Sequence, residues 1–314
     1  MFTVAWSPDG QRLASGSRDG AIQLWNPHNV SYEGIDEEHG QEEGDERAAV
    51  PVVVYDLKRV SPSASAIHHF THCILTLAWS PNGRLLAAGD TAGVVRIWSS
   101  DSGELLITYR GHTRFVRTVA WSPDGRYLAT GGDFGDSTVQ VWEAATGRRI
   151  TLYTEQYRIF AAPWSPQGEI IASASFDGTV HLWKALSGEK LLTYRGHHGP
   201  VYALVWSPDG QYLASAGQDA TVQVWSAIDG TLLQTYRGHS QPIKALAWSP
   251  DGHAIASGSD DATVQIWSPL TGQPIMTTDK HPAWIRAIAW SPACDTIAVA
   301  SDSNVYLWSV DSII

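Results

Sequence analysis

The chain of 314 residues contains little sulfur, little phenylalanine and little charge: two Cys, two Met, six Phe and 17% charged residues. Cys73 and Cys294 are too few for a disulfide framework or a four-thiolate metal site. No apolar run approaches the roughly 18 residues of a membrane helix, and the N-terminus lacks the charged and apolar regions of a signal peptide. We therefore expect a cytoplasmic protein that does not use a membrane as partner.

Basic residues are also scarce, with 21 Lys and Arg against 32 Asp and Glu and a net charge of −11. Eight of the acids lie in residues 33–47, beside a single basic residue, Arg47. An acidic chain is repelled by phosphate backbones, so nucleic acid is not an expected partner. The acidic run itself is either a solvated disordered loop or a docking site for a basic partner.

Motifs for catalysis are missing. The sequence has no phosphate-binding loop, no Gly-x-Ser-x-Gly elbow, no zincin helix and no paired metal-binding thiols. The run around His68, His72 and Cys73 is the only cluster with ligand chemistry, but on a strand His68 and His72 would lie about 13 Å apart. We expect no enzymatic activity, no metal and no cofactor.

Tryptophan, in contrast, is abundant, and its 15 copies follow a repeat. The motif Trp-Ser-Pro begins at residues 6, 79, 121, 164, 206, 248 and 290, mostly 42 residues apart. A second Trp follows at 25, 98, 142, 183, 225, 267 and 308. The step from the first unit to the second is longer and contains the acidic run, so we interpret residues 29–66 as an insertion into the first of seven units.

Each unit has the pattern of four short strands, expected in the fifth unit at 201–206, 212–216, 221–225 and 232–236. The sequence Ser-Pro-Asp-Gly at 207–210 suits a type I turn between the first two strands. Helical periodicity is absent. A four-stranded sheet of this size cannot bury both of its faces alone, so we predict that the seven units stack radially into a closed ring.

The repeats resemble the WD-repeat β-propellers, with bacterial-type repeats, over the whole chain except about residues 29–66. Gly-His pairs stand at 111–112, 196–197 and 238–239 before the first strand of their units, and an Asp stands six residues before most of the second Trp residues. No unit has the Trp-Asp pair that names the family. The resemblance implies an all-β, seven-bladed propeller with four-stranded antiparallel blades.

The propeller is expected to form a single domain, 1–314. Its blades are expected at about 1–60, with the insertion 29–66, and at about 67–110, 111–153, 154–195, 196–237, 238–279 and 280–314. Because the sequence stops six residues after Trp308, we expect the last blade to lack a full outer strand. Three explanations remain open: a trimmed segment of a longer protein, a tolerated three-stranded blade, or an edge paired with another chain. The oligomeric state is left open.

The resemblance also implies a buried hydrogen-bonded network of His, Ser or Thr, Asp and Trp in several blades, with a structural role. The residues at these positions are His112, Thr130, Asp136 and Trp142; His197, Ser215, Asp219 and Trp225; and His239, Ser257, Asp261 and Trp267.

In family propellers, the loops before the first strand and between the second and third strands form one rim of the central channel. Aromatic and basic residues gather at these positions here, and we predict a partner-binding rim of Phe2, Arg18, Phe115, Arg117, Phe134, Arg158, Phe160, Phe176, Tyr202, Lys244, Trp284 and Arg286. Exposed aromatics beside Arg are typical of interface anchors. The alternative is that these aromatics plug the channel or pack between blades.

The sequence therefore favours a non-catalytic scaffold for protein interactions. We expect it to bind a peptide or protein segment, acidic or phosphorylated, over the channel mouth, because Arg clusters suit carboxylate and phosphate groups. The alternative function is a ligand-sensing C-terminal domain of a larger bacterial signalling ATPase or kinase. A propeller does not by itself determine a function.

Overall fold

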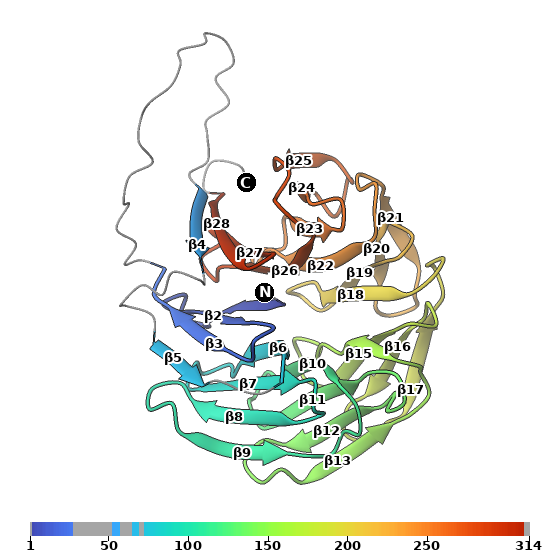
Figure 1. The fold of residues 1–314 in the computed structure, drawn as a ribbon. Helices are drawn as coiled ribbons and strands as arrows, with labels where there is room; N and C mark the ends of the chain where they lie inside the picture. Colours follow the sequence, from blue (N-terminus) through green and yellow to red (C-terminus); the bar gives the residue numbers. More distant parts are fainter. Residues whose placement is uncertain (1, 28–51, 57–64, 69–71, 311–314) are drawn as a thin grey trace, which may run out of the picture.

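The computed structural model describes residues 2–27, 52–56, 65–68 and 72–310. Their strands form seven four-stranded antiparallel sheets arranged in a ring (Figure 1). The predicted all-β, seven-bladed propeller is confirmed. Within these residues no helix is long and apolar enough to cross a membrane. The run at 68–73 that has ligand chemistry lies partly outside the described residues, and the acidic residues 33–47 lie entirely outside them.

Blades 1 to 3 come from the first half of the chain. Blade 1 contains β1 (Thr3–Trp6), β2 (Leu13–Gly16), β3 (Ile22–Trp25) and β5 (Ser65–His68). Blade 2 contains β6 (Ile74–Trp79), β7 (Leu85–Asp90), β8 (Val95–Ser99) and β9 (Leu105–Tyr109). Blade 3 contains β10 (Val116–Trp121), β11 (Tyr127–Gly132), β12 (Val139–Glu143) and β13 (Arg149–Tyr153).

The other four blades complete the ring. Blade 4 contains β14 (Ile159–Ala161), β15 (Ile170–Ser175), β16 (Val180–Lys184) and β17 (Lys190–Tyr194). Blade 5 contains β18 (Val201–Trp206), β19 (Tyr212–Gly217), β20 (Val222–Ser226) and β21 (Leu232–Tyr236). Blade 6 contains β22 (Ile243–Trp248), β23 (Ile255–Ser259), β24 (Val264–Trp267) and β25 (Pro274–Thr277). Blade 7 contains β26 (Ile285–Trp290), β27 (Thr296–Ser301), β28 (Asn304–Ser309) and β4 (Val52–Asp56).

The turn between the first two strands of each blade is built by its own side chains. In blade 5, Gly210 N–H donates to the Ser207 carbonyl over 2.9 Å, which closes the predicted turn. Asp209 Oδ1 accepts from the Ser207 hydroxyl at 2.5 Å and from Gln211 N–H at 2.9 Å. The turn thus satisfies its polar groups locally, which explains why Ser-Pro-Asp-Gly recurs in four of the seven repeats.

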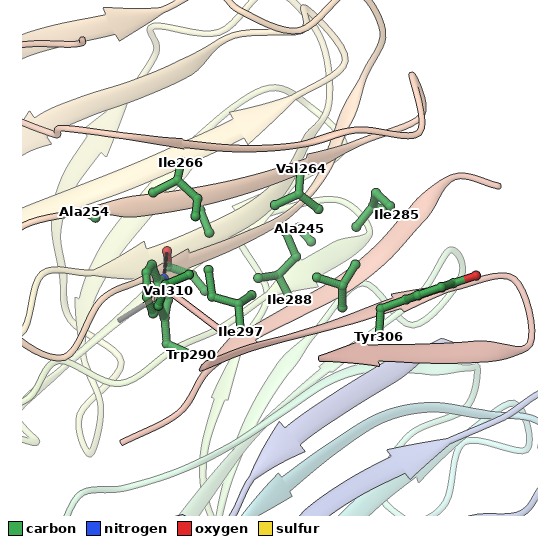
Figure 2. Close-up of a cluster of buried hydrophobic side chains, with 13 residues drawn as sticks. Ala245, Ala254, Val264, Ile266, Ile285, Ile288, Trp290, Ile297, Tyr306 and Val310 are labelled. Atoms are coloured by element: carbon green, nitrogen blue, oxygen red, sulfur yellow. Dashed lines mark hydrogen bonds between the residues drawn. The ribbon is translucent and has the colours of Figure 1, made fainter. Parts of the chain in front are cut away.

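Neighbouring blades bury one another's faces. Figure 2 shows the cluster between blades 6 and 7, where Ile266 of β24 and Ile288 of β26 belong to one buried group. The first Trp of a repeat also ties adjacent blades together. Trp290 Nε1, for example, donates to the Ala247 carbonyl of the preceding blade over 3.1 Å. The second Trp stacks on a Tyr of the preceding blade, as Trp225 does on Tyr194 with ring centroids 4.3 Å apart.

The expectation that blade 7 lacks a full outer strand is wrong. Strand β4 pairs antiparallel with β28, from Val52 opposite Trp308 to Asp56 opposite Asn304 (Figure 1). The closing strand comes from the stretch that the sequence analysis treated as an insertion. The outer strand of a blade only has to lie beside the edge of that sheet. The residues before and after it in the sequence can therefore belong to another blade. Because β28 has a partner on each side, it offers no free edge for the pairing with another chain that was one of the three open explanations.

The same stretch also completes blade 1. Strand β5 pairs with β3, with Ile22 opposite His68. Blade 1 therefore extends to His68, past the boundary near residues 60 to 67 that the repeat spacing predicts. The chain leaves blade 1 after β3, supplies β4 to blade 7 and returns with β5 to blade 1 (Figure 1). This path links the first and last blades on their outer edges.

Candidate functional site at the mouth of the central channel

The predicted polar network lies inside the blades, away from the channel. In blade 5, His197 contacts Asp219 Oδ2 at 3.0 Å and Ser215 Oγ at 2.8 Å, and Trp225 Nε1 donates to the same hydroxyl at 3.0 Å. The arrangement recurs in blade 3 (His112, Thr130, Asp136, Trp142) and blade 6 (His239, Ser257, Asp261, Trp267). Burial alone would raise the pKa of Asp219, but hydrogen bonds from His197 and backbone N–H groups outweigh it and lower this pKa. Such closed networks stabilise blades rather than perform chemistry.

One residue of each blade faces the channel at the same repeat position, four residues before the first Trp. We call these seven residues the channel ring: Phe2, Leu75, Arg117, Phe160, Tyr202, Lys244 and Arg286. In six blades this residue lies where the register between the first two strands shifts. A bulge of this kind places one extra residue in the strand and re-aims its side chain. The bulge thus frees one position in each of these six blades from packing within the sheet.

The channel ring lines a cavity of about 380 Å³, together with Arg158 and Phe176 of blade 4. Eight of the twelve predicted rim residues therefore meet at one cavity. The four others, Arg18, Phe115, Phe134 and Trp284, do not line it. The sequence analysis missed Leu75, although its position in the repeat could have identified it.

A second set of residues stands sixteen positions after each member of the channel ring, in the loop between the second and third strands. We call it the loop ring: Arg18, Thr91, Asp133, Phe176, Gln218, Asp260 and Asp302. Its members contact their partners in the channel ring in several blades. Tyr202 donates to Gln218 Oε1 at 2.7 Å, and Lys244 Nζ lies 3.5 Å from Asp260 Oδ2.

Asp133 joins two blades at the cavity. Its Oδ2 accepts from Arg117 Nε at 2.8 Å and Nη2 at 2.6 Å, and its Oδ1 lies 2.6 Å from Arg158 Nε. Burial by itself would raise the pKa of Asp133, but the hydrogen bonds from Phe134 N–H and Arg117 and the charges of both arginines outweigh it and lower this pKa. One carboxylate thus orients two guanidinium groups. The sequence analysis missed Asp133, although it occupies the repeat position of Asp260.

The cationic side of the cavity continues into blades 6 and 7. Lys244 Nζ lies 3.4 Å from the centre of the Tyr202 ring, and Arg286 Cζ lies 4.9 Å from that of Trp284. Burial lowers the pKa of Lys244; Asp260 opposes this, and the positive charges of Arg286 and Arg158 lower it further. Within the described residues, no carboxylate forms an ion pair with Arg286. Arg158 and Arg286 are therefore close enough to Lys244 to repel its positive charge.

An aromatic row leads from the rim into the cavity. Successive rings lie 4.9 to 6.5 Å apart in the order Phe134, Tyr157, Phe176, Phe160 and Tyr202. Arg158 Cζ lies 5.1 Å from the Phe160 ring and 5.6 Å from the Phe176 ring. Tyr157, which the sequence analysis missed, fills the gap between the rings of blades 3 and 4. None of the other repeats has a Phe, Tyr or Trp at the position equivalent to Tyr157, so the repeat gives no signal for it.

Four of the seven rim aromatics are not enclosed between blades. Phe134 is 62% exposed, Trp284 is 53% exposed, and Phe115 and Phe176 are each 42% exposed. Arg18 is exposed in the loop between β2 and β3. Arg side chains near aromatic faces offer an anion charge-assisted hydrogen bonds and offer apolar groups a flat contact surface. Within the described residues, no group of three or more His, Cys, Asp and Glu could hold a metal ion.

Comparisons with known proteins agree with the repeat. The family described as "WD domain, G-beta repeat" matches residues 2–26, 62–99, 103–143, 149–184, 188–226, 230–268 and 272–309. Two similar eukaryotic proteins are Protein HIR1 of Candida albicans, 26% identical over 202 residues, and the F-box-like/WD repeat-containing protein TBL1X of Homo sapiens, 30% identical over 209 residues. Each match covers 64% of this chain, but only 19% of HIR1 and 31% of TBL1X. The chain thus matches less than a third of the length of these relatives.

A solved structure supports the architecture. One chain of the structure described as "Crystal Structure of Mitotic Checkpoint Complex" matches with a TM-score of 0.81 and 22% identity, over 99% of this chain and 87% of that chain. At this level of identity the likeness shows the fold alone. The seven matched repeats, each forming one blade, show that the chain belongs to the WD-repeat family of β-propellers.

Proposed function

We propose that this propeller is a non-catalytic interaction scaffold that binds an extended acidic or phosphorylated protein segment over the mouth of its central channel. The observation that carries the proposal is the cavity itself, where Arg117, Arg158, Lys244 and Arg286 converge in a protein with a net charge of −11. Electrostatic attraction would draw an anionic segment to this region, whereas the negative charge of the rest of the protein would repel it.

The aromatic row supports a peptide rather than a small free anion. Phe134 and Tyr157 extend beyond the cavity and present apolar area next to the cationic groups. A segment that places an anionic side chain in the cavity can lay neighbouring apolar side chains on this row. Aromatic and Arg residues of this kind dominate the free energy of many protein interfaces.

The test is binding of fluorescein-labelled degenerate peptide pools that carry a fixed central Glu, phosphoserine or Lys. We expect the two anionic pools to bind and the Lys pool to fail. Replacing Arg117, Arg158 and Arg286 together by Ala should abolish binding. The matched control replaces Arg84, Arg126 and Arg148, which are exposed in turns at the other end of the strands, and removes the same charge. Equal losses in both triple variants would contradict the assignment to the channel mouth.

A second candidate function is a ligand-sensing domain of a larger signalling protein. It is supported by the small share of the relatives that the chain covers, which is 17% for Apoptotic protease-activating factor 1 of Danio rerio. This candidate predicts an ATPase or kinase encoded in the same reading frame as the propeller. Sequencing of the native transcript tests it, and a transcript without such a domain would contradict it.

A further inference from the structure

From the charges of the cavity, we infer that its anionic ligand is a phosphate monoester carried by a side chain, and not a carboxylate. This inference rests on the proposed function, because it assigns the chemical class of the group that enters the same cavity. It is based on the balance of charge, on the hydrogen-bond donors that remain and on the walls of the cavity.

The charged side chains at the cavity have a net charge of +2. Four cations line it, Arg117, Arg158, Lys244 and Arg286, and two carboxylates pair with them, Asp133 and Asp260. Including the rest of the loop ring adds Arg18 and Asp302 and leaves the balance unchanged. A carboxylate would neutralise only half of this charge. A phosphate monoester carries about −1.5 to −2 at neutral pH and would neutralise most or all of it.

The donors that remain also exceed what a carboxylate can accept. Arg117 uses Nε and Nη2 on Asp133, and Arg158 Nε lies 2.6 Å from the same carboxylate, so both guanidinium groups keep N–H groups on their other edges. Lys244 and Arg286 add further donors. A phosphate monoester offers three acceptor oxygens in a tetrahedral arrangement, whereas a carboxylate offers two in one plane. Cations that approach from blades 3, 4, 6 and 7 suit the tetrahedral group.

The geometry of these cations is set before any ligand enters. Asp133 is 6% exposed and holds Arg117 from its own blade and Arg158 from the next. Arg158 is further restrained by its backbone, because its carbonyl accepts from Phe176 N–H at 3.1 Å. Side chains that are already ordered lose less conformational entropy on binding. Asp133 is thus a positioning residue for the two arginines.

The apolar walls increase the effect of each charge. Phe2, Leu75 and Phe160 complete the channel ring between the cations and line part of the cavity with apolar side chains. Charge interactions beside apolar groups in a concave site are stronger than those at an open surface. The difference between one and two ligand charges should therefore be large enough to measure.

The experiment compares degenerate peptide pools that differ only in a fixed central residue: phosphoserine, phosphotyrosine, Glu or Ser. Binding is measured by fluorescence anisotropy on the full chain. We expect at least one phosphorylated pool to bind about tenfold or more tightly than the Glu pool, the step expected for one additional charge-assisted hydrogen bond. Comparing the two phosphorylated pools shows which side chain carries the group.

The Arg286→Leu variant tests the count of charges. It lowers the balance at the cavity by one, so the preference for the phosphorylated pool over the Glu pool should shrink toward equality. Arg84→Leu is the matched control, because Arg84 is exposed in a turn at the other end of the strands, and it should retain the preference. Thermal unfolding of both variants verifies that they fold.

The possible failures are distinguishable. If the Glu pool binds as tightly as both phosphorylated pools, the phosphate inference is wrong and the proposed function stands. If the preference persists unchanged in Arg286→Leu, the count of charges is wrong. If no pool binds, or if binding survives the triple replacement of Arg117, Arg158 and Arg286, the proposed function fails together with the inference.

Discussion

Closure of the ring by β4 leads to a prediction about stability. The perturbation is a double substitution, Val53→Pro and Val54→Pro. Backbone N–H groups of successive strand residues point alternately toward and away from the neighbouring strand, so one of the two must face β28. Proline removes that donor and does not fit a paired strand. The five residue pairs between β4 and β28 should therefore be weakened or lost.

The expected magnitude follows from the ladder. A backbone hydrogen bond contributes roughly 1 kcal/mol net, so loss of a five-pair ladder costs on the order of 5 kcal/mol, reduced by the conformational entropy that the released strand regains. Domains of this kind unfold with a free energy of about 5 to 15 kcal/mol. Detachment of β4 would therefore remove a large share of the stability, and it would open blade 7 first.

The assay is hydrogen exchange of the β28 amides, Asn304 to Ser309, combined with denaturant unfolding. We expect faster exchange in β28, with the exchange of β20 in blade 5 much less affected, and a lower free energy of unfolding. The control is Val53→Ala with Val54→Ala, which keeps both backbone N–H groups and should retain most of the protection of β28. Unchanged protection of β28 in the proline variant would refute closure by β4.

Three further predictions concern single side chains. Burial lowers the pKa of His281 to about 4, so the unfolded chain takes up a proton at a higher pH than the folded one. The free energy of unfolding should therefore fall by up to about 3 kcal/mol as the pH drops from about 6.5 to 4. Denaturant unfolding at several pH values should show a shallower dependence on pH for a His281→Asn variant. Ser257→Ala removes the partner of His239 and Trp267 and should cost roughly 2 kcal/mol by denaturant unfolding, whereas the exposed Ser240→Ala should cost little. Trp284→Ala should change stability by less than about 0.5 kcal/mol, because the ring is 53% exposed, and a larger loss would show that it packs as core.

Several features were predictable because they repeat and form locally. The turn at 207–210 closes through Asp209 and Ser207, two residues apart, and the same letters recur in other units. The network around His197 also lies within one blade, so its residues keep a constant spacing. The repeat reveals such features, because an interaction within one unit requires the same residue types at the same spacing in each unit that has it.

The loop ring was predictable in principle, and part of it was found. Arg18 and Phe176 were assigned to the rim from their positions, but Asp133 was missed beside Phe134. Its repeat position equals that of Asp260, and its partner Arg117 lies sixteen residues earlier, the same spacing as between Lys244 and Asp260. A comparison of these two spacings would have found this pair.

The amino-acid sequence by itself determined the number of blades, their strands and the turns that join them, because these depend on hydrophobic alternation and on contacts between residues close in the chain. Only the tertiary structure decided how the ring closes and how the cavity is charged. The pairing of β4 with β28 joins residues more than 240 positions apart, and the contact of Asp133 with Arg158 crosses from one blade to the next. Neither interaction repeats along the chain, so periodicity contains no trace of them.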